Sequence, residues 1–210
     1  MPSLETLLLF TAAAALMNIS PGPSNLYVFS RGLAQGPRAG LVAAGGLATG
    51  GMVHVVAAAL GVSALLQLSA TAFTVLKLVG AAYLVWLGLR YLLTPGAGPL
   101  EARSVAATPY PRIFRESVLV EVLNPKTALF FLAFLPQFVA LDAGPVAPQI
   151  VLLGLIVTAT ALPCDALVAV ASGRVAKALE RRPFVERLRN RLSGAILVGL
   201  GVFVALAKRA

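Results

Sequence analysis

The sequence holds few charged residues and few of the side chains that bind metals or carry covalent chemistry. Only 12% of its 210 residues are charged, about half the share of an ordinary soluble domain. It has one cysteine, Cys164, and one histidine, His54. A lone cysteine excludes an intramolecular disulfide framework and a cysteine-based metal cluster, and one histidine excludes an H-E-x-x-H zinc motif. We therefore expect no metal and no cofactor, and an enzyme is disfavoured.

Hydrophobic residues make up 59% of the chain, and its mean hydropathy is +0.89. They form runs long enough to cross a bilayer, which takes about 20 residues in a helix. Helices of a soluble bundle would carry a polar face, and these runs have almost none. The start of the chain lacks a basic n-region, so we expect the first run to be retained rather than cleaved. The sequence thus predicts an all-α membrane protein with six transmembrane helices, at residues 4–29, 39–66, 71–93, 117–141, 147–171 and 192–207.

The formal net charge is +9, but the basic residues lie in short segments between the apolar runs. This distribution argues against a nucleic-acid partner, which would need one basic face on a soluble domain. The first, third and fifth connections contain Lys or Arg, and the second and fourth contain none. Because Lys and Arg gather in cytoplasmic loops, we expect both termini outside. Lys208 and Arg209 at the end of the chain oppose this weakly.

Residues 94–111, rich in Pro, Gly and Ala, divide the single membrane domain of residues 1–210 into two halves. The first half, 1–93, and the second, 112–210, each contain three predicted spans. With both termini outside, the halves have opposite orientations, and each opens with a run that contains proline. We therefore predict a 3+3 inverted repeat.

Two proline interruptions lie inside apolar runs, at Ile19-Ser20-Pro21-Gly22-Pro23-Ser24-Asn25 and at Leu123-Asn124-Pro125-Lys126. Proline has no N–H and clashes with the carbonyl one turn back, so each interruption should break or kink its helix and free backbone carbonyls. Such groups are tolerated at membrane depth only when they are buried in protein or line a wet cavity. Paired broken helices in corresponding halves indicate a binding site. The predicted substrate-binding residues are Pro21, Gly22, Pro23, Ser24, Asn25, Asn124, Pro125, Lys126 and Asp165.

Three ionisable residues at membrane depth are candidates for proton coupling: Asp165, Glu121 and His54. An ionised side chain at mid-bilayer costs about 3 kcal/mol on insertion scales, so each should face the protein interior. Asp165 follows Pro163, which should also interrupt its helix; an ion pair with Lys126 is the structural alternative. Glu121 could instead lie near the cytoplasmic interface. A lone histidine is more often a hydrogen-bonded structural residue than a proton relay.

Small residues recur at a spacing that lets helices approach closely. Gly46 and Gly50 form a G-x-x-x-G pair, and Ala195 and Gly199 form a similar pair in the last run. Packing within the chain is the simpler interpretation, and a homo-oligomer remains compatible with it.

Short motifs are distributed over nearly the whole chain. They are Ser20-Pro21-Gly22-Pro23, the Gly45–Gly51 cluster with His54, Leu60-Gly61-Val62, Gly80-Ala81-Ala82-Tyr83-Leu84 with Gly88, Leu123-Asn124-Pro125-Lys126, Phe130-Phe131, Phe134-Leu135 and Pro136-Gln137-Phe138. In combination these motifs resemble those of the LysE/RhtB family of amino-acid exporters. Glu121 departs from the family, which often has an amide or an apolar residue there, and this departure leaves open a different substrate preference.

The resemblance implies a multi-pass protein of the cytoplasmic (inner) membrane of a bacterium, in contact with membrane lipid. It implies export of an amino acid or close derivative, driven by protons. The residues suggest how: N–H groups after Pro23 would bind the substrate carboxylate, and freed carbonyls with Asp165 would bind its ammonium. A divalent-cation exporter and a passive pore or assembly subunit remain the alternatives. The chain does not say which amino acid is exported.

Overall fold

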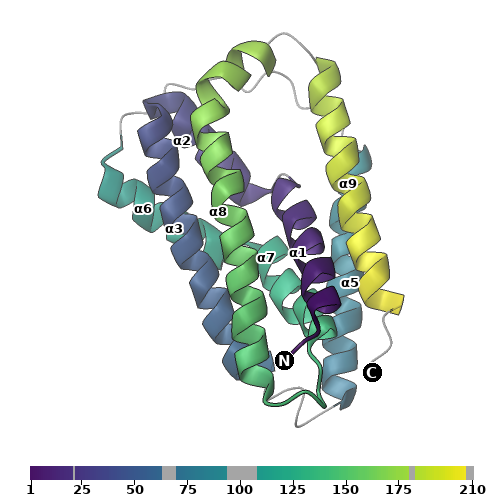
Figure 1. The fold of residues 1–210 in the computed structure, drawn as a ribbon. Helices are drawn as coiled ribbons and strands as arrows, with labels where there is room; N and C mark the ends of the chain where they lie inside the picture. Colours follow the sequence, from purple (N-terminus) through teal and green to yellow (C-terminus); the bar gives the residue numbers. More distant parts are fainter. Residues whose placement is uncertain (21, 63–69, 94–107, 180–182, 207–210) are drawn as a thin grey trace.

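The computed structural model describes residues 1–20, 22–62, 70–93, 108–179 and 183–206. All regular elements in this part of the chain are helical (Figure 1). Most helices lie roughly along one direction, and α5 and α9 pair at one side of the bundle. The helices are α1 (Leu4–Ile19), α2 (Pro23–Gln35), α3 (Pro37–Ala57), η1 (Ala58–Val62), α5 (Ala70–Leu93), α6 (Tyr110–Val122), α7 (Pro125–Leu129), η2 (Phe130–Phe134), η3 (Leu135–Phe138), α8 (Val146–Leu179) and α9 (Pro183–Leu206).

The first predicted interruption is a real break. α1 ends at Ile19, α2 begins at Pro23, and their axes differ by 52°. Proline at the first helical position is favourable because the missing N–H would have no partner inside the helix. Gly22 is the N-cap of α2 and contributes no side-chain cap.

The second interruption separates α6 from α7 with a bend of 43°. Asn124 caps α7, because its side-chain oxygen accepts a hydrogen bond from the Lys126 N–H at 3.1 Å. After α7 the chain forms the π-helical turn η2 and then the 3₁₀ turn η3. Aromatic rings of these two turns pack against Phe10 of α1 and form much of the buried core.

The prediction that Pro163 interrupts its helix is wrong. α8 is helical from Val146 to Leu179 and contains Pro163 in its interior. The helix packs on α3 on both sides of the proline: Gly154 lies against Val55, and Gly40 lies against Ala169. Tertiary packing therefore holds α8 together where the local sequence alone favours a break.

Four spans at most can be identified from length and composition among the described residues. Two stretches are each long and apolar enough to cross a membrane, Pro37–Val62 and Val146–Ser172. Two more are obtained if each bent pair, α1 with α2 and α6 with the turns after it, is one span. α9 contributes only a shorter apolar stretch, Gly194–Leu206, and α5 is not among the candidates. Six spans therefore stay a prediction.

Close glycine contacts give the relative directions of the helices. Gly46 lies against Ser117 and Gly50 against Glu121, so α3 and α6 run parallel. The Gly154–Val55 and Gly40–Ala169 contacts make α3 and α8 antiparallel. α5 and α9 are antiparallel as well, because Gly88 contacts Gly194 and Ala81 contacts Gly201. The Gly46 and Gly50 pair thus packs within the chain.

The two ends of the bundle differ in charge. The α2–α3 and α8–α9 junctions, which lie in basic segments of the sequence, are at one end in Figure 1. α1 begins and α9 ends at the other, where the Met1 ammonium donates to the Ala143 carbonyl at 2.6 Å. Arg103, Arg181, Arg182, Lys208 and Arg209 lie outside the described residues.

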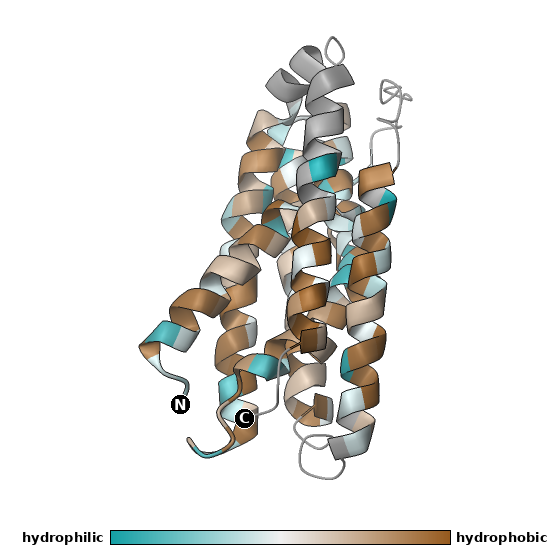
Figure 2. Cartoon of the chain, turned by 90° about the vertical axis from the view of Figure 1, so that its right-hand side faces the viewer, coloured by the Kyte–Doolittle hydropathy of each residue, from teal (hydrophilic) through white to brown (hydrophobic). Residues whose placement is uncertain are grey.

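The outer faces of the helices carry large apolar side chains, as a lipid-facing surface does. In Figure 2 the helical ribbons are coloured mostly as hydrophobic residues, with some hydrophilic positions among them. Leu4 and Leu60 are each 73% exposed, and Leu167 is 71% exposed. This distribution is the reverse of a soluble bundle, in which the exposed helix faces are polar.

Candidate functional site

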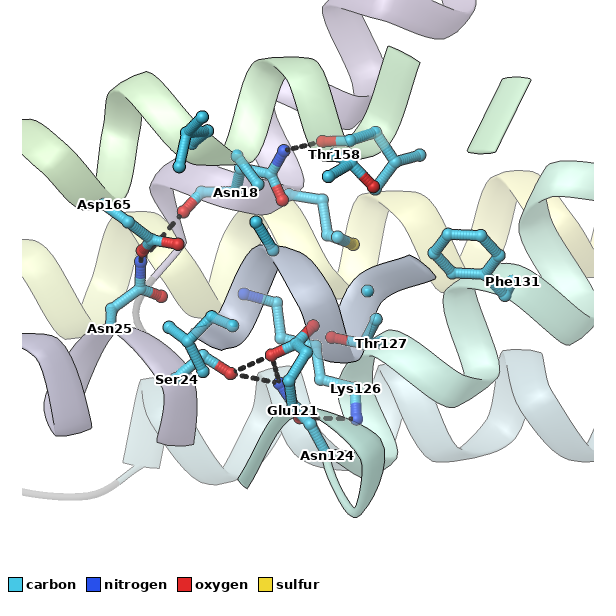
Figure 3. A pocket seen from close by; sticks show the side chains of 17 residues that line it. Asn18, Ser24, Asn25, Glu121, Asn124, Lys126, Thr127, Phe131, Thr158 and Asp165 are labelled. Atoms are coloured by element: carbon cyan, nitrogen blue, oxygen red, sulfur yellow. Dashed lines mark hydrogen bonds between the residues drawn. The ribbon is translucent and has the colours of Figure 1, made fainter. Parts of the chain in front are cut away.

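The two breaks face each other across a pocket inside the bundle (Figure 3). Residues of α1, α2, α3, α6, α7 and α8 line it, together with Asn124 and Phe131. About 570 Å³ inside it and at its open mouth, including space open to solvent, is not filled by atoms. The segments of the two interruptions and of Asp165, far apart in the sequence, therefore meet at one place.

Glu121 joins the second break to the first. The Ser24 hydroxyl, in the first turn of α2, donates to the Glu121 carboxylate. The Asn124 amide donates to Ser24 Oγ at 2.8 Å and lies 3.4 Å from Glu121 Oε2. Glu121 is only 9% exposed, so its side chain faces the interior of the bundle.

Lys126 makes the second connection between the breaks. Its ammonium donates to the Ser20 carbonyl, at the C-terminal end of α1, with an Nζ–O distance of 2.5 Å. The side chain is 4% exposed and passes directly beside Gly22, where a Cβ would lie 3.3 Å from Lys126 Cδ. The proposed alternative, an ion pair between Lys126 and Asp165, is not among the salt bridges of the described residues.

Asp165 lies on the opposite wall of the pocket, on α8. Asn25 donates to its Oδ1 at 3.1 Å and also lies 3.4 Å from the Asn18 carbonyl. Asn18 in turn donates to the Val157 carbonyl at 3.2 Å. The first break is thus hydrogen-bonded to α8 on one side and to the second break on the other.

His54 is not a pocket residue. Its Nε2 lies 2.9 Å from the Glu121 carbonyl, and its ring stacks on Phe131 with centroids 5.7 Å apart. The Glu121 carbonyl is the one that Pro125 deprives of its helical N–H donor. His54 and the Asn124 N–H, at 3.0 Å, fill that role instead. The geometry fits the structural interpretation of this histidine.

Most of the predicted site residues line the pocket: Ser24, Asn25, Glu121, Asn124, Lys126 and Asp165. Gly22, Pro23 and Pro125 are not in the lining and act through the helix ends that they form. Pro21 lies outside the described residues. Within the described part of the chain, no group of three or more His, Cys, Asp and Glu residues is placed to hold a metal.

The pocket also has an apolar wall that the sequence did not reveal. Met17, Leu47, Phe131, Val157 and Leu162 contribute to it. Nothing in their local sequence separates these residues from the lipid-facing ones of the same runs. Thr127 and Thr158 add hydroxyl groups to the lining.

A polar cluster connects α2 with α6 and with Thr108 towards the basic end of the bundle. Arg31 pairs with Glu116 at 2.7 Å and donates to the Thr108 hydroxyl at 3.0 Å. Tyr27 donates to the same Glu116 carboxylate at 2.8 Å. Gln35 makes two hydrogen bonds with the Thr108 backbone, at 2.9 and 3.0 Å. These contacts join the first half of the chain to the second.

Comparison with known proteins supplies the family. The model of the LysE type translocators matches residues 15–208, nearly the whole chain. The chain belongs to the LysE family. A membrane protein YrhP of Bacillus subtilis (strain 168), itself uncharacterized, is 32% identical over an alignment of 212 positions, which covers 97% of this chain and 100% of that protein.

Two further LysE relatives carry functional names. A homoserine/homoserine lactone efflux protein of Salmonella typhimurium is 28% identical over 205 residues, 96% of each chain. A leucine efflux protein of Enterobacter sp. (strain 638) is 27% identical over 196 residues, 93% of each chain. No solved structure matches the chain. LysE membership and these names indicate a membrane transporter rather than an enzyme.

Proposed function

We propose that this protein exports an amino acid or a close derivative across the cytoplasmic membrane of a bacterium, coupled to protons. Membership of a translocator family and relatives named as amino-acid efflux proteins support the class of activity. The observation that carries the proposal is the meeting of two broken helices and Asp165 at one pocket. Discontinuous helices whose ends point at a shared cavity are the usual substrate sites of secondary transporters.

The proposed topology has six spans, both termini outside and an inverted 3+3 repeat. The alternating helix directions support it: α3 is antiparallel to α8 and parallel to α6, as their places in such a topology require. The position of the first residue of α1 and the last of α9 at one end of the bundle also supports it. Basic segments at the opposite end would then face the cytoplasm.

The pocket offers complementary groups to the two charges of an α-amino acid. The first turn of α2, at Ser24 and Asn25, is the positive end of a helix dipole and suits the substrate carboxylate. Asp165 in the lining suits the ammonium, as does the Ser20 carbonyl, which lies behind the lining and is bonded by the lining residue Lys126. The apolar wall with Leu47 and Phe131 is available for the substrate side chain.

Asp165 is the proposed coupling residue. A proton taken up from outside would neutralise its carboxylate, weaken its attraction for the ammonium and favour release there. The proton would then return to the cytoplasm while the site is empty. Rocking of one three-helix half against the other would expose the pocket to each side in turn.

Uptake of labelled amino acids into inverted membrane vesicles tests the proposal. Vesicles that contain the protein should accumulate at least one amino acid when a proton gradient is imposed, and vesicles without it should not. Absence of gradient-dependent accumulation for every amino acid would contradict the proposal. Transport of labelled Mn²⁺ or Zn²⁺ instead would favour the divalent-cation exporter, and equilibration without a gradient would favour a passive pore.

A further inference from the structure

Two charged side chains of the second half occupy the helix ends that the first break exposes. Lys126 donates to the Ser20 carbonyl at the C-terminal end of α1. The Glu121 carboxylate accepts a hydrogen bond from Ser24 in the first turn of α2. Both side chains line the same pocket and are almost fully buried, at 4% and 9% exposure.

The signs of these charges match the ends that they occupy. A helix carries partial negative charge at its C-terminus and partial positive charge at its N-terminus. The ammonium of Lys126 bonds the Ser20 carbonyl at the former, and the carboxylate of Glu121 lies beside the latter, bonded to the Ser24 side chain of its first turn. An α-amino acid carries the same pair of groups. The break is therefore satisfied by the protein in the way that a zwitterionic substrate would satisfy it.

We infer that Glu121 and Lys126 stand in for the substrate when the site is empty. This inference rests on the proposed function and assigns a further role to its site. An arriving amino acid would displace the Glu121 carboxylate from Ser24 and the Lys126 ammonium from Ser20. The two displaced side chains would then be free to pair with each other. Asp165 is not one of the two displaced groups, because its hydrogen-bond partner is Asn25 of α2.

The arrangement would serve the return step of the transport cycle. An exporter must reorient without substrate, and an empty break would leave helix ends unpaired in a low-dielectric interior, which costs free energy. Surrogate charges remove that penalty. They also compete with the substrate, so they weaken its binding while they speed the return of the empty protein.

The substitution Glu121→Gln separates these effects, because glutamine keeps the shape and one acceptor oxygen but loses the charge. The full-length protein in liposomes is given a mixture of ¹⁴C-labelled protein amino acids and L-homoserine. Exchange of internal for external label does not require the protein to reorient without substrate, whereas net efflux does. In the variant, the substrate concentration that half-saturates exchange should fall on the order of tenfold, as expected for loss of one competing charge-assisted hydrogen bond. The rate of exchange should be retained, and net efflux should slow by a similar factor.

Controls distinguish this role from the others. Asp142→Asn removes an exposed carboxylate of the link before α8 and should leave both transport modes unchanged. The pH dependence of half-saturation should be kept in Glu121→Gln, whereas a proton-coupling residue would remove it. If Glu121→Gln does not fold, Lys126→Gln should give the same separation of exchange from net efflux.

Several results would overturn the inference. If the half-saturating substrate concentration rises and both exchange and net efflux are lost, Glu121 is a direct substrate ligand. Equal effects on exchange and net efflux with unchanged half-saturation would make its role structural. Absence of transport in both modes for the unaltered protein would contradict the proposed function itself, which is a different outcome from failure of the variant alone.

Discussion

At the scale of single residues, the backbone groups freed by proline are bonded by side chains from elsewhere in the chain. The Glu121 carbonyl accepts from His54, and the Ser20 carbonyl accepts from Lys126. An unpaired buried polar group is expensive in a low-dielectric interior, so these contacts permit the breaks to exist. Of the two donors, Lys126 lines the pocket, whereas His54 lies outside the lining.

His54 provides the first test at this scale. His54→Phe removes a donor to the Glu121 carbonyl and should destabilise the protein by about 1–2 kcal/mol, because only the backbone N–H groups of Leu123 and Asn124 then donate to it among the described residues. His54→Gln can still donate and should lose less. Thermal unfolding of the purified variants in detergent measures both. Proton-driven accumulation should survive in the glutamine variant, and its abolition there would reinstate His54 as a relay.

Asp165 provides the second test. Asp165→Asn keeps the side-chain shape beside Asn25 but cannot gain or lose a proton. Gradient-driven accumulation in inverted vesicles should fall at least about tenfold, as for the loss of a charged contact worth roughly 1.4 kcal/mol or more. Exchange in the absence of a gradient should continue. An Asp165→Asn protein with full proton-coupled accumulation would exclude this carboxylate from coupling, with Asp142→Asn as the matched control.

The polar half of the pocket could be predicted from the sequence, and the apolar half could not. Charged and amide side chains are rare in these runs, so Asn25, Glu121 and Asp165 were conspicuous. Met17, Leu47 and Phe131 look like every other apolar residue of a membrane helix. Their place in the lining depends on helix rotation and neighbours, which hydropathy does not encode.

At the scale of helices, glycine sets the distance between neighbours. α5 and α9 meet backbone to backbone, since a Cβ on Gly88 would lie 2.7 Å from the Gly194 carbonyl and one on Gly194 would lie 2.6 Å from the Gly88 carbonyl. Without a hydrophobic driving force between helices in lipid, such close contact is a main source of association. By contrast, a Cβ on Gly199 would meet nothing within 4 Å.

The substitution Gly88→Ala tests this seam. The added methyl group must push against backbone atoms of α9, which cannot move aside as a flexible side chain can. We expect destabilisation of about 1–3 kcal/mol, seen as a lower thermal unfolding temperature. Gly199→Ala on α9 is the control and should leave that temperature unchanged or raise it slightly. An equal decrease of the unfolding temperature in both variants would show that the close contact of α5 and α9 at Gly88 has no special role in stability.

Helix positions were more predictable from sequence than helix continuity or pairing. The run at 71–93 corresponds closely to α5, and the run at 147–171 corresponds to the apolar stretch Val146–Ser172 of the longer helix α8. The breaks at Pro23 and Pro125 were predicted from the chemistry of proline, and in the structure each proline follows an N-cap residue, Gly22 or Asn124. Pro163 follows Leu162 within a strongly apolar helix and did not break it. The local sequence therefore does not fully distinguish a proline that breaks a helix from one that does not, because packing against neighbouring helices also contributes.

At the scale of the whole molecule, the two halves are joined by polar contacts at the basic end of the bundle. Arg31 and Glu116 lie about two turns from the pocket along α2 and more than one turn along α6, counted from Ser24 and Glu121. Gln35 and Thr108 lie further towards the same end. In the proposed topology these contacts close the pocket from the cytoplasm. Loading of substrate would then require α2 and α6 to separate.

A cross-link between Gln35→Cys and Thr108→Cys, in a Cys164→Ser background, tests this requirement. A short bifunctional thiol reagent should hold the two segments together and reduce gradient-driven accumulation at least about tenfold, because the pocket could no longer open at that end. A cleavable form of the reagent should restore transport on reduction. Each single-cysteine protein, treated with the same reagent, should keep its activity. Full transport by the cross-linked protein would mean that α2 and α6 stay together throughout the cycle and that the cytoplasmic path lies elsewhere.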